Sequence, residues 1–301
     1  MCAATQGLAM TDRNTLFRSV LYMPGSKIRA LEKAKTLDVD ALIFDLEDAV
    51  SPDEKPMARE LVCKAVKTGG YGRRSVIIRI NGLDSTWGMD DLSAACAAAP
   101  DAILVPKVNS ADELKQIEKL MKGFGLPENT RIWAMMETPL GILNAQSIAA
   151  ATPMLEAFVM GTNDLVKDLS AAHTPDRSPV LTSLSLCLLA SRAYGLVCVD
   201  GVYNAFKDDE GLRASCQQGC DMGFDGKTLI HPAQLAITNE VFAPSADDIA
   251  QAQTYVDAFN EAKSRGVGVA VVNGGIVENL HVETAQKLLV KAAVIASVTG
   301  I

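Results

Sequence analysis

Eight short apolar segments alternate along the chain with longer segments of helical periodicity, and this alternation constrains the fold more strongly than any other feature. The apolar segments cover residues 19–23, 41–46, 76–80, 102–105, 132–136, 157–160, 197–199 and 226–230. Eight strand and helix units in succession predict an α/β fold, a (β/α)8 TIM barrel. A doubly wound parallel sheet is the alternative, but no G-x-G-x-x-G motif follows any of the strands.

The predicted barrel accounts for only part of the 301 residues. We expect a disordered N-terminus over residues 1–15, the barrel over residues 16–244, and a C-terminal extension with helices and a lid over residues 245–301. Within the extension, residues 245–266 are typical of a capped helix, and a glycine-rich stretch over residues 266–279 precedes a final helix. Glycines on both sides of that stretch indicate a lid that moves.

Charge and cysteine content narrow the class of protein. The net charge of −8 and the pI near 5.0 argue against a nucleic acid or an anionic membrane as the partner, and favour a small molecule. The seven cysteines are irregularly spaced and form no C-x-x-C pair, as expected of reduced thiols in the cytoplasm. The sequence has no long apolar span and no leader-like N-terminus, so we expect a soluble cytoplasmic protein.

The second predicted strand ends in crowded acidic residues. Asp45, Glu47 and Asp48 lie within four positions at the end of the run Ala41–Val50. Carboxylates this close repel one another unless a proton, a metal ion or an arginine lies between them. We therefore expect a cationic group beside this segment.

A helix start signal follows the acidic residues. Ser51 is predicted to be an N-cap, Pro52 to occupy the first helical position, and Glu54 to complete a capping box. Because Ser51 can cap the helix, Asp48 is not needed for that purpose.

Further charged and polar side chains follow the other strands, and in a TIM barrel such positions surround the active site. With the acidic segment they are Asp45, Glu47, Asp48, Arg79, Asn81, Lys107, Glu137, Asp164 and Asp200, while Lys227 lies within the last strand. The chain has only three histidines, so a site built on imidazole is disfavoured. An oxygen-rich set of this kind suits Mg²⁺ or Mn²⁺.

Several of these positions belong to longer motifs that resemble a known family. The motifs are Arg18–Gly25, Phe44–Val50, Arg79–Asn81, Leu83–Gly88, Glu137–Gly141, Gly161–Leu165 and Phe224–Pro232. In this order they resemble the citrate lyase β-subunit-like members of the aldolase/citrate lyase family. The resemblance implies a TIM barrel with a C-terminal extension, assembled as a homotrimer or a larger oligomer. It also implies a Mg²⁺-dependent carbon–carbon lyase that acts on malyl-CoA, citramalyl-CoA or citryl thioesters.

The resemblance assigns roles to individual residues. Glu137 and Asp164 match the two carboxylates that bind the metal ion, and Arg79 matches the arginine that contacts the substrate carboxylate or the thioester oxygen. Glu47 and Asp48 match groups that accept hydrogen bonds from metal-bound water and orient Arg79. An internal ion pair of Arg79 with Glu47 or Asp48 is the structural alternative for these three residues.

The resemblance also extends to the acyl-CoA and to a neighbouring subunit. Phe17, Arg18 and Lys27 correspond to positions near the CoA. Glu278 stands where the family has a catalytic aspartate, which the lid carries into the barrel of the next subunit as acid or base. Here the carboxylate is retained on a side chain that is longer by one methylene.

Other functions stay open at this point. A Schiff-base aldolase would use Lys107 or Lys227 as the nucleophile. A malyl-CoA thioesterase would admit water to the same site, and a non-catalytic protein would bind the CoA thioester without reaction. Nothing in the chain separates a free CoA thioester from the carrier-protein thioester of a citrate lyase complex, and the hydroxyacyl group is also undetermined.

Overall fold

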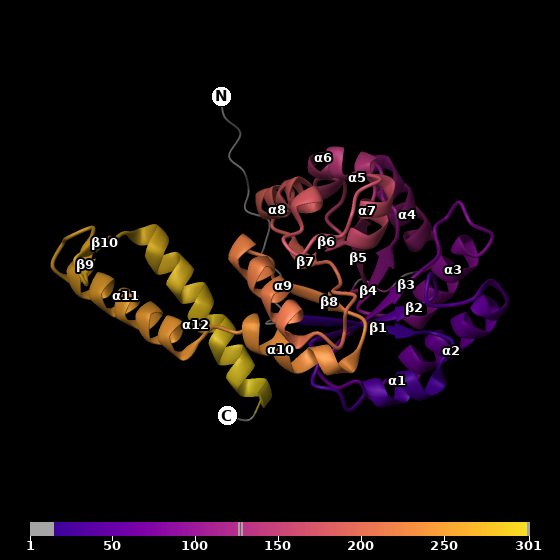
Figure 1. Cartoon of the computed structure of the whole chain (residues 1–301), viewed down its shortest axis with the longest axis horizontal. Helices are drawn as coiled ribbons and strands as arrows, with labels where there is room; N and C mark the ends of the chain where they lie inside the picture. Colours follow the sequence, from indigo (N-terminus) through magenta and orange to yellow (C-terminus); the bar gives the residue numbers. More distant parts are fainter. Residues whose placement is uncertain (1–14, 126, 128, 300–301) are drawn as a thin grey trace. The chain divides into compact units, whose positions relative to one another are not determined.

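The computed structural model of the chain describes residues 15–125, 127 and 129–299. The predicted disorder of residues 1–15 falls almost wholly outside them. Eight parallel strands form a closed barrel in sequence order, and β8 pairs with β1 to close it (Figure 1). The strands are β1 (Ser19–Pro24), β2 (Ala41–Asp45), β3 (Ser75–Arg79), β4 (Ala102–Val105), β5 (Arg131–Met136), β6 (Leu155–Met160), β7 (Val197–Asp200) and β8 (Gly226–Leu229). The predicted TIM barrel is confirmed, and each strand overlaps its predicted segment.

Helices connect the strands and lie around them (Figure 1). They are α1 (Ile28–Ala34), α2 (Lys55–Thr68), α3 (Gly88–Ala98), α4 (Ala111–Gly123), α5 (Pro139–Leu143), α6 (Ala145–Ala149), α7 (Thr162–Asp168), α8 (Leu181–Tyr194), α9 (Asp209–Met222) and α10 (Leu235–Val241), with 3-10 turns η1 (Pro52–Glu54), η2 (Ser178–Val180) and η3 (Pro232–Gln234). The barrel interior is filled by apolar side chains such as Ile43, Leu104 and Trp133, all fully buried. This packed interior leaves the carboxyl ends of the strands for chemistry.

The helix start at Ser51 differs from the prediction. Ser51 has an extended backbone, but its side chain caps no backbone N–H, and Pro52–Glu54 form a 3-10 turn before α2. The Ser51 hydroxyl donates instead to the carboxylate of Glu54, at 3.0 Å. The predicted capping box is therefore wrong, because its two side chains bond to each other and not to the backbone.

The chain divides into two compact units, Phe17–Asn239 and residues 240–299. The second unit contains α11 (Ala246–Ser264), the antiparallel strands β9 (Ala270–Val272) and β10 (Gly275–Val277), and α12 (Asn279–Thr299). Ser245 caps α11 in a capping box with Asp248, which confirms the predicted capped helix. The glycine-rich stretch is a hairpin whose turn, Asn273–Gly274, has positive φ at both residues, as an Asn-Gly turn favours.

Two expectations from the sequence concern the cysteines and the absence of a membrane-spanning segment, and the described residues agree with both. Cys63, Cys96, Cys187, Cys198 and Cys216 are buried free thiols, and Cys220 is half-buried. None of the helices that the structure describes has the length and apolarity needed to cross a membrane.

Candidate active site

A cavity of about 300 Å³ opens at the carboxyl ends of the barrel strands. Its wall contains polar groups from several strand ends, including Tyr22, Asp45, Asp48, Arg79 and Asp164. A cavity with a few convergent polar groups at this end of a TIM barrel is the expected place for an active site.

Arg79 is the cation that the crowded carboxylates require. Asp45 and Arg79 are direct neighbours across β2 and β3, and Nε and Nη2 of Arg79 each donate to a carboxylate oxygen of Asp45 at 2.6 Å. Nη1 lies 2.8 Å from Glu47 Oε2 and 3.6 Å from Asp48 Oδ2. The structure thus brings together the three residues that the sequence singled out. It adds Asp45 as the main partner, which only the strand register reveals.

The surroundings of Arg79 keep it charged. Burial lowers the pKa of Arg79, but the adjoining Asp45 carboxylate outweighs burial and raises that pKa well above its ordinary value. The ring of Tyr22 covers the guanidinium at 4.9 Å. Burial also raises the pKa of the Tyr22 hydroxyl, so this group stays protonated. Arg79 is therefore a fixed, permanently charged group on the wall of the cavity.

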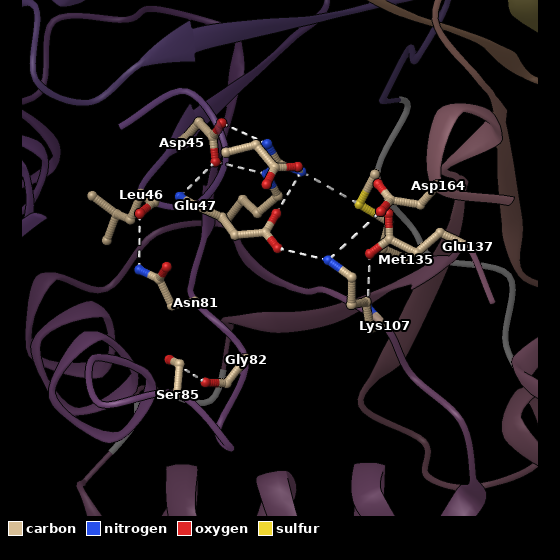
Figure 2. A network of polar contacts seen from close by, with 12 residues as sticks. Asp45, Leu46, Glu47, Asn81, Gly82, Ser85, Lys107, Met135, Glu137 and Asp164 are labelled. Carbon is tan, nitrogen blue, oxygen red and sulfur yellow. Dashed lines mark hydrogen bonds and ion pairs between the residues drawn. The ribbon is translucent and has the colours of Figure 1, made fainter. Parts of the chain in front are cut away.

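Glu137 is a buried carboxylate at the end of β5 that is only partly satisfied. Its Oε1 accepts a hydrogen bond from the backbone N–H of Lys107 at 2.9 Å (Figure 2), whereas Oε2 is buried and has no hydrogen-bond partner among the described residues. Burial, together with the nearby carboxylates of Glu47 and Asp164, raises the pKa of Glu137 to about 7. A buried carboxylate oxygen without a donor is a position where a cation fits.

Asp164 lies in the first turn of α7, and Lys107 connects it to the other carboxylates. The ammonium of Lys107 is 3.9 Å from Asp164 Oδ1 and 3.2 Å from Glu47 Oε1 (Figure 2). Glu137 and Asp164 thus contact the same lysine. Among the described residues no three His, Cys, Asp or Glu side chains form a metal site. These two carboxylates would leave the other positions of a hard metal ion to water and substrate, as Mg²⁺ prefers.

Gly161, the residue before α7, fixes the position of Glu137. A Cβ atom at Gly161 would lie 2.5 Å from Oε2 of Glu137 and would also overlap the Cβ of Glu137. We expect Gly161→Ala to displace the Glu137 carboxylate and to reduce kcat/KM on the order of a hundredfold, since a shift of about 1 Å has this effect. Gly123→Ala is the control, because a Cβ atom there meets nothing within 4 Å. A Gly161→Ala variant with the activity of the control would contradict the steric argument.

Lys55 shapes the acidic loop, and sequence reasoning missed it. Its buried ammonium donates to the carbonyls of Leu46 and Glu47 at 3.0 and 2.8 Å, and to the amide oxygen of Asn81 at 2.7 Å. Asn81 is held in turn by the buried carboxylate of Asp91, at 2.6 Å. Three acceptors satisfy the three donors of the ammonium, so the loop backbone is clamped to the start of α2.

Two residues expected near the CoA lie at the other end of the barrel. Arg18 precedes β1, is buried, and makes two hydrogen bonds of 2.9 Å to the carboxylate of Asp40. Phe17 packs edge-on against Trp133, with ring centroids 5.3 Å apart. Since β1 runs away from both toward the cavity, the assignment of Phe17 and Arg18 to CoA binding is corrected to a structural role. Lys27, just past β1, is exposed and pairs only loosely with Glu54, at 3.4 Å.

Neither Lys107 nor Lys227 is suited to act as the nucleophile that forms a Schiff base. The surrounding carboxylates, of which Glu47 acts most strongly, outweigh burial and raise the pKa of Lys107, so its amine is protonated. Lys227 is fully buried and bonds to Asp200 at 2.8 Å. Asp200, which the sequence grouped with the other strand-end acids, also binds Arg177 at 2.7 Å and does not line the cavity.

Glu278 lies between β10 and α12 in the second unit. Its side chain is exposed, and its backbone N–H donates to Nδ1 of His281 at 3.0 Å. An exposed carboxylate next to a short hairpin is accessible to another molecule. Its assignment to a neighbouring active site remains a prediction.

Comparison with known proteins adds sequence relatives of almost the same length. The HpcH/HpaI aldolase/citrate lyase family matches residues 18–232. A (3S)-malyl-CoA thioesterase of Cereibacter sphaeroides is 57% identical over 281 residues, covering 93% of this chain and 96% of the relative. The citrate lyase subunit beta of Leuconostoc mesenteroides subsp. cremoris is 36% identical over 283 residues, covering 92% of this chain and 94% of the relative.

A solved structure is similar over nearly the whole chain. The CitE protein of Mycobacterium tuberculosis, crystallised with magnesium, acetoacetate and coenzyme A, covers 93% of this chain with 100% of its own, at 25% identity and a TM-score of 0.77. Fold, motifs and relatives agree with the resemblance drawn from the sequence. The chain belongs to the HpcH/HpaI aldolase/citrate lyase family.

Proposed function

We propose that the protein is a Mg²⁺-dependent thioesterase that hydrolyses a malyl-CoA type thioester to the free hydroxy acid and CoA. The observation that carries the proposal is that Arg79 and Asp164 line one cavity, while the buried Glu137 carboxylate and Asp164 both contact Lys107. The 57% identity to (3S)-malyl-CoA thioesterases supports hydrolysis over the lyase reaction that we expected first from the sequence. The partner would be an acyl-CoA, with no role for nucleic acid or membrane.

The residues present fit a divalent cation. Glu137 and Asp164 would hold Mg²⁺ or Mn²⁺, and the unpartnered Oε2 of Glu137 supports this. When bound, such an ion polarises oxygen atoms and orients a hydroxy acid that binds to it. CitE of M. tuberculosis, which was crystallised with magnesium, has the same barrel fold.

Arg79 would bind and polarise the substrate. Asp45 engages its Nε and Nη2. Nη1 lies 2.8 Å from Glu47 Oε2 and would donate one of its two N–H groups to a carboxylate or a thioester oxygen in the cavity. Hydrolysis adds water across the thioester: the water oxygen bonds to the carbonyl carbon, the C–S bond breaks, and the CoA sulfur takes a proton. A fixed cation stabilises the oxyanion that forms on the way. Lys27, just past β1, would contact the CoA phosphates.

The lyase reaction is the second candidate, favoured by the 36% identity to citrate lyase subunit beta. Here a base takes the proton of the substrate hydroxyl, the C–C bond breaks, and the electron pair forms the enolate of acetyl-CoA or a homologue. The other product is a 2-oxo acid such as glyoxylate. Arg79 would stabilise the enolate.

The two reactions differ in their products. Purified protein with (3S)-malyl-CoA and Mg²⁺ should release thiol and malate in equal amounts, without glyoxylate. Glyoxylate and acetyl-CoA would instead identify a lyase. Turnover of a carrier-protein citryl thioester alone would identify a citrate lyase subunit, and binding of malyl-CoA without turnover of any thioester would identify a non-catalytic protein. Controls with EDTA test the metal.

Glu278 is proposed as the acid or base, supplied by the lid of a neighbouring subunit in a homotrimer or hexamer. We expect Glu278→Ala and Glu137→Ala each to be inactive alone. Mixed oligomers of the two should regain part of the activity, because some sites combine an intact Glu137 with an intact Glu278 from another chain. Activity measured after refolding the two together tests this. An active Glu278→Ala oligomer would reject the catalytic role, and inactive mixed oligomers of verified composition would reject the arrangement in trans.

A further inference from the structure

We infer that the ammonium group of Lys107 is an internal cation that holds the site carboxylates together in the metal-free protein and competes with the divalent cation for them. The inference rests on the metal site of the proposed function and is independent of which reaction the site performs. It concerns metal affinity and specificity, and it assigns Lys107 a role other than that of a nucleophile.

The contacts of Lys107 converge on the proposed metal ligands (Figure 2). Its backbone N–H donates to Glu137 Oε1 at 2.9 Å, and its Nζ is 3.2 Å from Glu47 Oε1 and 3.9 Å from Asp164 Oδ1. One residue therefore contacts three carboxylates, two of them the proposed ligands. The other nearby cation, Arg79, has two of its three nitrogens bonded to Asp45, and its third lies 2.8 Å from Glu47.

The backbone of Lys107 is in the left-handed region, with φ of +49°. Residues other than glycine and asparagine rarely adopt this backbone conformation, because it is unfavourable for a residue with a Cβ atom. Here the conformation serves to direct the N–H and the ammonium of the same residue to the carboxylates. Beside the site, this conformation is consistent with a function for the Lys107 side chain.

Charge explains why an internal cation is needed. Arg79 already pairs with Glu47 at 2.8 Å, but without Lys107 the Glu137 and Asp164 carboxylates would lose the ammonium beside them, and their repulsion opposes folding. An ammonium 3 to 4 Å away relieves this repulsion. A divalent cation placed between Glu137 and Asp164 would in turn be repelled by the ammonium. Since 48% of the Lys107 side chain is exposed, the ammonium can swing away without unpacking the core.

The alternative is an ordinary surface ion pair, which contributes little to stability or binding. A direct measurement of metal affinity separates the two. Mn²⁺ is titrated into metal-free protein and followed by electron paramagnetic resonance at pH 8. We expect Lys107→Met to bind Mn²⁺ on the order of tenfold more tightly than the wild type. Lys107→Gly, which suits the positive φ, should show the same gain and provides a second variant.

Two control variants distinguish an effect of the Lys107 charge at the site from an effect of the net charge of the protein. Lys115→Met removes one positive charge from α4, where Lys115 pairs with Asp112 and does not line the cavity. Its Mn²⁺ affinity should equal that of the wild type. Lys107→Arg keeps the charge and should also stay close to the wild type. Tighter binding by Lys115→Met as well would assign the effect to net charge and overturn the inference.

Thermal unfolding gives a second readout. Lys107→Met should unfold at a lower temperature than the wild type in EDTA, and Mn²⁺ should remove that difference. An equal deficit with and without Mn²⁺ would mark a merely structural residue. Unchanged or weaker Mn²⁺ affinity in both Lys107→Met and Lys107→Gly would overturn the inference and leave the proposed function intact. A wild type that binds no Mn²⁺ would overturn the metal site as well.

Discussion

Glu137→Gln is expected to lose metal binding and the proposed thioesterase activity, and yet to make the metal-free protein more stable at neutral pH. Glutamine keeps the size of the side chain and the acceptor for the Lys107 N–H, but it has no charge to offer a metal ion. A loss of at least a thousandfold in kcat/KM is typical for removal of such a ligand. Metal content after dialysis and activity with added Mg²⁺ provide the measurements. Stoichiometric metal in the variant would contradict the ligand assignment.

The gain in stability follows from the pKa of Glu137. Burial raises that pKa from 4.5 to about 7, so folding favours the protonated carboxyl. The resulting stability is fully present below pH 4.5 and is lost as the pH rises from 4.5 to 7. The variant has no such loss, and should therefore match the wild type near pH 4 and exceed it by about 3 kcal/mol near pH 8. Urea unfolding in EDTA at both pH values measures the difference. A variant less stable than the wild type at pH 8 would refute this account.

The same titration links the metal to pH. A proton on Glu137 competes with the metal ion, so Mg²⁺ affinity should fall as the pH drops below 7. Added Mg²⁺ should stabilise the wild type at pH 8 and leave Glu137→Gln unchanged. The Glu137 carboxylate thus lowers the stability of the metal-free protein, and it is also the proposed ligand of the metal ion.

Arg79→Lys should lose most of the activity although it preserves the charge. A lysine cannot make the paired hydrogen bonds to Asp45 and also donate to the substrate. We expect kcat/KM to fall by at least thirtyfold, corresponding to about 2 kcal/mol of transition-state binding. Steady-state kinetics with malyl-CoA measures the loss.

Arg192→Lys is the matched control for this substitution. Arg192 pairs with Asp225 at 3.0 Å, is 47% exposed, and does not line the cavity, so its replacement should leave the activity unchanged. If Arg79→Lys were as active as Arg192→Lys, Arg79 would be reduced to an internal ion-pair partner of Asp45.

The sequence predicted the barrel well because its signals are local. Each strand is a short run of apolar residues next to a segment of helical periodicity. Such patterns can be recognised from neighbouring residues alone, without knowledge of contacts between distant segments. The carboxylates that follow β2, β5 and β6 were identifiable for the same reason, since strand ends in a TIM barrel meet at one face. The position of these residues at strand ends was therefore enough to predict that their side chains lie close together.

What sequence reasoning missed depends on contacts between distant segments. The pairing of Asp45 with Arg79 requires the register of two strands, and the clamp made by Lys55 requires the path of a loop. Arg18 was misassigned because its motif continues into β1, while the residue itself lies before the strand. Ser51 had the right neighbours for a capping box, but its hydroxyl donates to the Glu54 carboxylate and accepts no backbone N–H.

The acidic loop after β2 keeps its shape through backbone groups. The Asp45 carboxylate accepts hydrogen bonds from the N–H groups of Glu47 and Ala49 at 2.9 and 3.1 Å, and Lys55 binds the carbonyls of Leu46 and Glu47. The side chain of Glu47 takes no part in these bonds. Mutations at this position can therefore alter the charge of the cavity while the loop stays folded. The support of the loop and the charge that Glu47 brings to the site can thus change independently of each other.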